Sequence, residues 1–412
     1  MSGEILFLAH RIPFPADRGD KIRSSRILAA LGALAPVHVG TFAENAVDLA
    51  SKRELAAHSA SHCLVRRSKS LALAGLEALG SGHPVSIPAF ASARLHRWVA
   101  KTLRERPISA IFVFSSQMAQ YIPHDFPGRV VMDFVDVDSA KFEEYALTAR
   151  QPLRTLYRRE ARLLAKWERD VHRRASVSLL VTVEEAALFS RRLDLAQVRD
   201  AKVAVMGNGI DADSFDPANV GSAQIIGADE GPHIVFVGQM DYPPNVSAAV
   251  RFATRILPLI AADMRGARFH VVGRAPTAAV RALDGRDGCT VHGEVADVRP
   301  WLAAADLVIA PLIIARGIQN KVLEAMAMAR PVLVSPQAAT GIAGCDGIHF
   351  AIADSDDEFA TRAIALLRSP EERTRIGQAA RDFVIAHHGW TEALAQLPRL
   401  VGIASSEARD AA

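Results

Sequence analysis

Short apolar runs alternate with longer amphipathic runs along the whole chain, and this alternation is the strongest constraint on its fold. In the first half the strand-like runs lie at 5–9, 37–42, 110–114, 129–134 and 177–182, and in the second half at 233–238, 268–273, 289–293, 306–312, 330–335 and 348–353. Helix-like runs such as 20–34 and 91–103 separate them. Strands that alternate with helices form parallel sheets from βαβ units. The sequence therefore predicts an α/β protein.

Length and turn-forming residues indicate two doubly wound, Rossmann-like domains. A chain of 412 residues is longer than one core usually spans. Both halves open with a strand, a proline-bearing loop and a helix, in "FLAHRIPFPADRGDKIRSS" and "FVGQMDYPPNVSAAV". We predict an N-terminal domain over 1–205, a linker over 206–232 that is rich in Gly, Asn, Asp and Pro, and a C-terminal domain over 233–385. A helix and tail over 386–412 could pack back on the first domain.

Composition and charge exclude several classes of protein. The chain is 50% hydrophobic and 23% charged, as soluble globular proteins are. A net charge of +3 gives no global reason to expect nucleic acid as a partner. The three cysteines form neither a disulfide framework nor a metal-binding spacing, which favours a reducing cytoplasm. We see no signal peptide and no apolar stretch long enough to span a membrane, so we expect a cytoplasmic protein.

The stretch "ARGIQNKVLEAMAMARPVLVS" at 315–335 is the best candidate for a ligand site. It follows a predicted strand, and open parallel sheets bind ligands beyond the carboxyl ends of their strands. With Asn320 as N-cap, the helix start would bind a phosphate, and Lys321 would add a charge there. Glu324, one turn on, could accept hydrogen bonds from vicinal hydroxyls of a ribose. The alternative is an ordinary surface Lys–Glu pair, which contributes only a few tenths of a kcal/mol.

This stretch resembles the donor-site signature of family-4 glycosyltransferases, whose GT-B fold places two Rossmann-like domains across a cleft. "VMGNGIDADSF" resembles the interdomain segment of that family, and "VHGEVADVRPWLAAADLVIAPL" resembles its base-recognition loop with the following helix and strand. Together with "FVGQMDYPPNVSAAVRF" and "AHRIPFPADRGDKIRS", these segments resemble a narrower group, the sugar transferases associated with exosortase (PEP-CTERM) exopolysaccharide loci. The resemblance implies a retaining enzyme whose N-terminal domain, 1–205, binds the acceptor and whose C-terminal domain, 233–385, binds a nucleotide-sugar donor.

The resemblance also implies roles for individual residues. Glu324 would bind the donor ribose, and the turn before it would contact the donor sugar or its phosphates. The segment from His292 to Val295 would frame the base, and Gly19 would approach the diphosphate. The donor-binding residues expected on these grounds are Gly19, Gly238, Gln239, His292, Gly293, Val295, Gly317, Ile318, Gln319, Asn320 and Glu324.

Two positions depart from the pattern of the family. Arg316 stands where many relatives carry a glutamate, and Gln239 lies in a loop, "GQMDYPPN", where many carry an Arg and a Lys. We infer that Arg316 and Lys321 neutralise the leaving diphosphate instead, as a metal would. No metal and no cofactor are therefore expected. The "DVD" at 136–138 has the spacing of a divalent-ion motif, but it lies in the half expected to hold the acceptor.

Aspartates after the strand 129–134 are the candidates for a catalytic carboxylate. Many relatives place a histidine at this strand end; here Asp133 or Asp136 would have to stabilise the transition state or orient the acceptor hydroxyl. Asp138 could instead simply cap the next helix.

A basic amphipathic run at 150–174 could lie on the inner face of the cytoplasmic membrane, near a lipid-linked acceptor. The alternative is a solvated helix whose leucine face packs on the N-terminal domain.

The sequence thus predicts a retaining hexosyltransferase that moves a sugar from a nucleotide sugar to a hydroxyl of a glycan or lipid-linked acceptor in exopolysaccharide biosynthesis. A nucleotide-sugar epimerase of similar fold and a non-catalytic nucleotide-sugar-binding scaffold are the alternatives. A nicotinamide dehydrogenase is disfavoured because neither domain start contains G-x-G-x-x-G.

Overall fold

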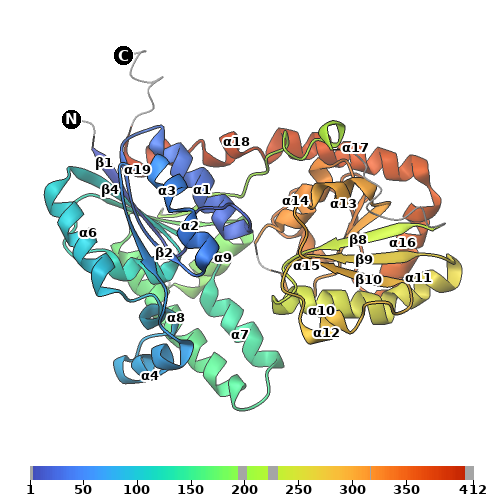
Figure 1. The fold of residues 1–412 in the computed structure, drawn as a ribbon, viewed down its shortest axis with the longest axis horizontal. Helices are drawn as coiled ribbons and strands as arrows, with labels where there is room; N and C mark the ends of the chain where they lie inside the picture. Colours follow the sequence, from blue (N-terminus) through green and yellow to red (C-terminus); the bar gives the residue numbers. More distant parts are fainter. Residues whose placement is uncertain (1–2, 194–201, 221–230, 316, 404–412) are drawn as a thin grey trace. The chain divides into compact units, whose positions relative to one another are not determined.

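The computed structural model describes residues 3–193, 202–220, 231–315 and 317–403. The chain forms two compact units, the first made of Met1–Gly207 with Ala393–Ala412 and the second of Asn208–Glu392. Each unit holds a parallel sheet with helices on both faces, as predicted (Figure 1). Residues 208–220, which the sequence assigned to a linker, belong to the second unit, where Ile210 lies in the core.

Unit 1 is built on a seven-stranded sheet with the order β3-β2-β1-β4-β5-β6-β7. Its strands are β1 (Glu4–Ala9), β2 (Val37–Ala43), β3 (Ser61–Arg66), β4 (Ile108–Phe114), β5 (Arg129–Val135), β6 (Val177–Leu180) and β7 (Val203–Val205). Every residue of β1 and β2 is buried, which explains why the apolar runs located them. The prediction missed β3, because this partly exposed edge strand, "SHCLVR", is not an apolar run.

The helices of unit 1 follow the strands in the expected alternation. They are α1 (Gly19–Gly32), α2 (Ala46–Ala50), α3 (Lys52–Ala57), α4 (Leu71–Ser81), α5 (Ser86–Ala89), α6 (Ala93–Glu105), the 3-10 helix η1 (Ser116–Tyr121), α7 (Asp138–Thr148), α8 (Leu153–Arg174), α9 (Val183–Arg192) and, from the end of the chain, α19 (Leu397–Val401). Asp138 is the first residue of α7 rather than its cap, because Val137 occupies the N-cap position.

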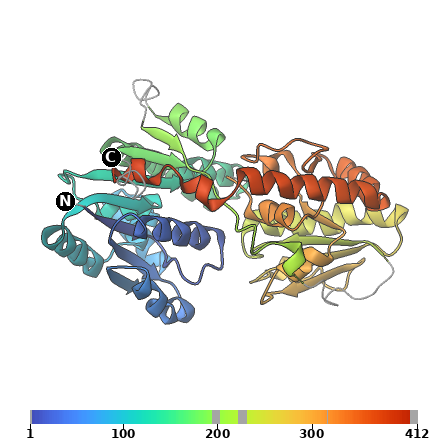
Figure 2. The ribbon, with the colours of Figure 1, turned by 90° about the horizontal axis from the view of Figure 1, so that it is seen from above.

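Unit 2 is built on a six-stranded sheet with the order β10-β9-β8-β11-β12-β13. The strands are β8 (His233–Val237), β9 (Arg268–Val272), β10 (Cys289–Gly293), β11 (Leu307–Ala310), β12 (Val332–Val334) and β13 (Ala351–Ile352). The helices around them are the 3-10 turn η2 (Pro217–Asn219), α10 (Pro243–Arg251), the π-helical turn η3 (Phe252–Ile256), α11 (Leu257–Asp263), α12 (Ala278–Arg281), α13 (Arg299–Ala304), α14 (Asn320–Ala327), α15 (Pro336–Ala339), α16 (Asp356–Arg368), α17 (Pro370–His387) and α18 (Trp390–Leu394). Seen from above, α17 runs as a long red helix along this unit and packs on α14 (Figure 2).

A buried ion pair joins distant parts of unit 1. The guanidinium of Arg23, on α1, donates to Asp133 Oδ2 at 2.9 Å, and both side chains are almost fully buried, with 1% and 0% exposed. The same guanidinium donates at 2.7 Å to the carbonyl oxygens of Met206 and Gly207, where the chain leaves the sheet. Because a charge without a partner is costly in the protein interior, α1, β5 and this chain exit are held together.

We expect Arg23→Leu to lower the free energy of unfolding by about 3–5 kcal/mol, because the Asp133 carboxylate would stay buried without its cation. Urea unfolding measures this loss. The control is Lys101→Ala, which breaks an exposed pair with Glu105 at 3.8 Å and should change stability by less than about 1 kcal/mol. If the two variants lose the same free energy of unfolding, the buried pair contributes no more to stability than the exposed one.

Candidate functional site

The helix α14 carries the two charged residues that the sequence singled out, Lys321 in its first turn and Glu324 in its second. The N-cap of this helix is Gln319, so the predicted cap, Asn320, is instead the first helical residue. The Asn320 side chain accepts a hydrogen bond from Asn208 Nδ2 at 3.2 Å. Gly317 has a φ of +62°, and its carbonyl accepts from Gln319 Nε2 at 3.3 Å. Glycine thus shapes the turn that leads into α14, with the partly buried Ile318 packed against the core.

Lys321 is held against the carboxyl end of β8. Its Nζ donates to Asn245 Oδ1 on α10 and lies 4.8 Å from the centroid of the Phe236 ring. The Asn245 amide also donates to the carbonyl of Gln239 at 2.9 Å. A Cβ on Gly238 would lie 3.1 Å from the Lys321 Nζ, so glycine at this position leaves room for the ammonium. The ends of β8, α10 and α14 therefore meet around one cation.

The environment brings the pKa values of Lys321 and Glu324 close together. Burial lowers the pKa of Lys321 to about 7, against the opposing effect of the Glu324 carboxylate. Burial likewise raises the pKa of Glu324 to about 7, against the opposing effect of Lys321. Near neutral pH each group gains or loses its proton readily, so a bound ligand can decide the charge of the site.

Three neighbouring strands end in glycine at this edge of the sheet. They are Gly238 after β8, Gly273 after β9 and Gly293 at the end of β10. Gly273 has a φ of +151°, and a Cβ there would lie 1.6 Å from the carbonyl oxygen of Gly238. Gly273 N also donates to Gly293 O at 2.8 Å. The strand ends thus pack backbone to backbone, which leaves a surface that a ligand can approach closely.

Arg274 supplies a cation that the sequence analysis missed. Its Nη2 donates to Gln239 Oε1 at 3.2 Å, and Gln239 donates in turn to Asp241 Oδ1 at 2.7 Å. The family pattern places its positive charges in the loop after β8, whereas this one follows β9. Adjacent parallel strands end at the same edge, and that rule could have found it. Arg316, the other predicted cation, lies outside the described residues.

The predicted base-binding segment is anchored by a row of histidines across the sheet. His233 Nδ1 lies 3.0 Å from His270 Nε2, and His270 Nδ1 lies 3.0 Å from His292 Nε2. The Trp301 ring packs on His292 with centroids 4.1 Å apart. Burial lowers the pKa of His292, which favours a neutral ring. Val295 packs partly against the core just beyond Gly293. This segment can therefore present a fixed, uncharged wall to a flat ligand.

In unit 1 the structure separates the two predicted catalytic aspartates. Asp133 is fully buried in the ion pair with Arg23 and accepts from Val135 N at 3.2 Å, so it has a structural role and cannot reach a substrate. Val135 has a φ of +69°, which is strained for a β-branched residue. This strained turn presents Asp136 beyond the end of β5.

Asp136 is the carboxylate of unit 1 that remains a catalytic candidate. One of its oxygens, Oδ1, has no hydrogen-bond partner among the described residues. Burial raises the pKa of Asp136 to about 7, and the nearby charge of Glu185 acts in the same direction. Glu185 accepts from Val137 N at 2.7 Å and so fixes the turn after Asp136. The arrangement suits a group that exchanges a proton near neutral pH.

The loop after β1 forms an ion-pair network beside Gly19, the first residue of α1. Asp20 pairs with Arg11 at 2.7 Å and with Arg18 at 3.2 Å. Glu44 pairs with the same two arginines, at 2.9 and 3.1 Å, and with Arg67 at 3.1 Å. Despite burial, hydrogen bonding to His10 and the charges of the arginines keep the pKa of Asp20 below its usual value. The three arginines therefore already have carboxylate partners.

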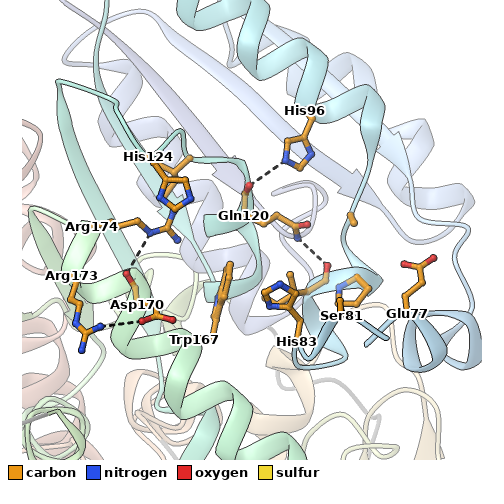
Figure 3. A pocket seen from close by; sticks show the side chains of 14 residues that line it. Glu77, Ser81, His83, His96, Gln120, His124, Trp167, Asp170, Arg173 and Arg174 are labelled. Carbon is orange, nitrogen blue, oxygen red and sulfur yellow. Dashed lines mark hydrogen bonds and ion pairs between the residues drawn. The ribbon is translucent and has the colours of Figure 1, made fainter. Parts of the chain in front are cut away.

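Unit 1 also contains a groove of about 830 Å³ between α4, η1 and α8 (Figure 3). Trp167 stands in its middle, with its Nε1 donating to Ser116 O at 2.9 Å. Ile87, Pro88 and Ile122 contribute apolar wall, while Arg173 and Arg174 lie at one side. None of the predicted site residues lines this groove.

Comparison with known proteins agrees with the fold. Residues 231–369 match the family model described as "Glycosyl transferases group 1". This segment contains Gly238, Lys321, Glu324 and the histidine row. A search of curated protein sequences finds no relative of the chain.

Solved structures with the GT-B glycosyltransferase fold match nearly the whole chain. Anabaena HepE in complex with UDP and glucose has a TM-score of 0.68 at 14% identity, covering 97% of this chain and 99% of that one. Sucrose-phosphate synthase from Thermosynechococcus elongatus has a TM-score of 0.71 at 14% identity, covering 100% of both chains. WaaG, a glycosyltransferase of lipopolysaccharide biosynthesis, has a TM-score of 0.63 at 19% identity, covering 97% and 100%. The predicted GT-B fold class is confirmed; the narrower exosortase-associated group stays a prediction.

No group of three or more His, Cys, Asp or Glu lies together in a way that could hold a metal ion within the part of the chain that the structure describes. Within the same residues, no helix has both the length and the apolar character needed to cross a bilayer.

We expect Lys321 in the folded protein to react with acetic anhydride half-maximally near pH 7, because burial lowers its pKa. In the urea-unfolded chain the half-reaction should move to about pH 10.4, the value of a free lysine. Glu324→Gln should lower the folded value further, because the Glu324 carboxylate favours the ammonium form. Mass spectrometry of the peptide that contains Lys321 measures the pH of half-reaction in each state. The same pH in folded and unfolded protein would contradict a lowered pKa for Lys321.

Proposed function

We propose that the protein is a retaining glycosyltransferase that moves a sugar from a nucleotide sugar to a hydroxyl of a glycan or lipid-linked acceptor. The observation that carries this proposal is the presence of Lys321 and Glu324, one turn apart at the start of α14, at the glycine-lined edge of the unit 2 sheet. The match of residues 231–369 to a glycosyltransferase family model supports it. We further propose that the protein is cytoplasmic and acts in exopolysaccharide synthesis, as the sequence resemblance implies.

The donor would bind to unit 2 through three contacts. Its diphosphate would lie at the N-terminus of α14, where backbone N–H groups, the helix dipole and Lys321 attract negative charge. Its ribose hydroxyls would donate to Glu324, and its base would pack along His292, Gly293 and Val295. The complex of HepE with UDP-glucose supports a uridine nucleotide as the first donor to test.

The chemistry needs stabilisation of the leaving diphosphate more than a covalent step. The bond between the sugar C1 and the diphosphate oxygen breaks, the acceptor oxygen bonds to C1 on the same face, and the acceptor proton passes to the diphosphate. Charged Lys321 and the start of α14 would stabilise the negative charge that develops on the leaving group. Arg274 and Arg316 are further candidates for this role. Asp136 would orient the acceptor hydroxyl.

The lowered pKa of Lys321 makes donor binding sensitive to pH. A bound diphosphate favours the charged ammonium, so above pH 7 binding must take up a proton. Affinity should consequently fall as pH rises above about 7, until the lysine of the complex also loses its proton.

We expect UDP to raise the melting temperature of the wild-type protein, because a ligand at about a hundred times its Kd adds about 2.7 kcal/mol. Glu324→Gln should abolish most of this shift. With the wild-type protein, GDP and ADP should raise the melting temperature by less than UDP does. Glu371→Gln, at an exposed position of α17 in unit 2, is the matched control and should retain the shift. If the wild-type protein melts cooperatively but no nucleotide raises its melting temperature, the proposed donor site is wrong.

We expect Asp136→Asn to lower kcat by about 10²–10⁴-fold, because it removes the ionisable group proposed to act on the acceptor. UDP release from UDP-glucose, with alkyl glycosides as acceptors, measures the rate. The Kd for UDP should stay unchanged, since the donor contacts lie on unit 2. Asp125→Asn, at an exposed position of unit 1, is the control. A normal rate in Asp136→Asn would remove this residue from the mechanism, and product formed without acceptor as an epimerised nucleotide sugar would overturn the transferase.

A further inference from the structure

The helix α4 presents its leucines to solvent and its alanines to the protein. Leu71, Leu73, Leu76 and Leu79 are 68%, 49%, 68% and 67% exposed, whereas Ala74 and Ala78 are fully buried. A helix on the surface of a soluble protein normally shows the opposite arrangement, with its large apolar residues facing the core. Contiguous exposed apolar residues usually mark an interaction site.

A second group of exposed leucines lies at the junction of α7 and α8. Leu147 is 76% exposed, Leu153 50% and Leu156 44%. Further along α8 the leucine face turns inward, and Leu164 is buried with only 1% exposed. The packing alternative for the run 150–174 therefore holds for the later turns of α8, while its start leaves leucines uncovered. We call the seven exposed leucines of α4 and this junction the leucine surface.

The two parts of the leucine surface are fixed to each other. Arg159, on α8, donates from Nη2 to the carbonyl of Ala78 on α4 at 2.8 Å. Glu160 accepts from Val85 N, just after α4, at 2.6 Å. Figure 1 shows α4 and the α7–α8 hairpin at the same end of unit 1. The leucine surface is thus carried by elements packed on one another.

Positive charge accompanies the part of the leucine surface at the α7–α8 junction. Arg150, Arg154 and Arg158 are exposed at four-residue intervals around the start of α8, and the sequence has no acidic residue from 145 to 159. Leucines beside arginines on a helix are typical of segments that lie in the interfacial layer of an anionic membrane. The groove of Figure 3 opens beside α4, where Glu77 and Ser81 line it, and combines apolar wall with Arg173 and Arg174. Such a groove suits the phosphate and first carbons of a lipid.

We propose that the leucine surface docks on an anionic phospholipid bilayer, with α4 inserted among the acyl chains near the headgroups and the arginines of α8 on the lipid phosphates. A second copy of the chain fits less well. In a symmetric dimer the same patch faces itself, so Arg150, Arg154 and Arg158 would lie near their own counterparts. The acid within the leucine surface, Glu77, already pairs with Lys69 at 2.7 Å. An anionic bilayer complements both the leucines and the arginines. The proposal is independent of the donor chemistry.

The test is sedimentation of the full-length protein with phosphatidylcholine vesicles that contain or lack phosphatidylglycerol. We expect binding to the phosphatidylglycerol vesicles, weakened by salt, and a loss of about tenfold or more in Leu76→Ser/Leu79→Ser, because two exposed leucines lose their burial in lipid. Arg154→Gln/Arg158→Gln should weaken binding and reduce its salt dependence. Ile385→Ser, which replaces a side chain 51% exposed on α17, is the matched control and should bind as the wild type does.

Folding is checked separately by circular dichroism and thermal melting of each variant, since the substituted side chains point to solvent. Failure of the wild type to bind vesicles would overturn the proposal, as would equal binding by Leu76→Ser/Leu79→Ser. A concentration-dependent dimer in sedimentation velocity that this variant abolishes would instead assign the leucine surface to self-association. Vesicle binding and UDP binding are separate measurements, so either proposal can fail alone.

Discussion

The buried charge of Arg23 is the constraint on which the geometry of unit 1 depends. A guanidinium is always ionised, so an interior that contains one must supply acceptors for it. Here Asp133 and the carbonyls of Met206 and Gly207 supply them, from β5 and from the chain after β7. The same Asp133 accepts from Val135 N and steadies the strained turn before Asp136. One structural ion pair thus positions the carboxylate that remains available for chemistry.

The cation of unit 2, Lys321, differs from Arg23 because it has no closely paired carboxylate among the described residues. Lys321 has an amide and an aromatic ring as neighbours rather than a closely paired carboxylate, so its desolvation is not fully compensated and its pKa falls. An anion that entered the site would supply the missing charge. At the donor site that we propose, the cost of keeping this lysine half-buried would be recovered when the diphosphate binds.

Residues buried on both faces of a sheet could be predicted from the sequence, whereas residues defined by their neighbours could not. The apolar runs located β1, β2 and the central strands, but the mixed sequence of β3 hid an edge strand. Spacing alone placed Lys321 and Glu324 in one helical turn. It could not show that Asp133 points to Arg23, 110 positions away in the chain, or that Arg274 reaches Gln239 from the next strand. The cap of α14 was wrong by one residue because Gln319 takes the extended backbone that precedes the helix.

The helix α4 shows the same limit in another form. "LALAGLEALG" is apolar on every side, so periodicity could not say which side faces the protein. The structure decides it: Ala74 and Ala78 are fully buried, and the Ala78 carbonyl accepts a hydrogen bond from Arg159 of α8 at 2.8 Å. The leucines are thus left on the side that faces solvent. A chain that kept alanines inward and leucines outward would lose solubility unless the leucines were covered for part of the time. The basic start of α8 would then serve to select an anionic surface among the apolar ones available.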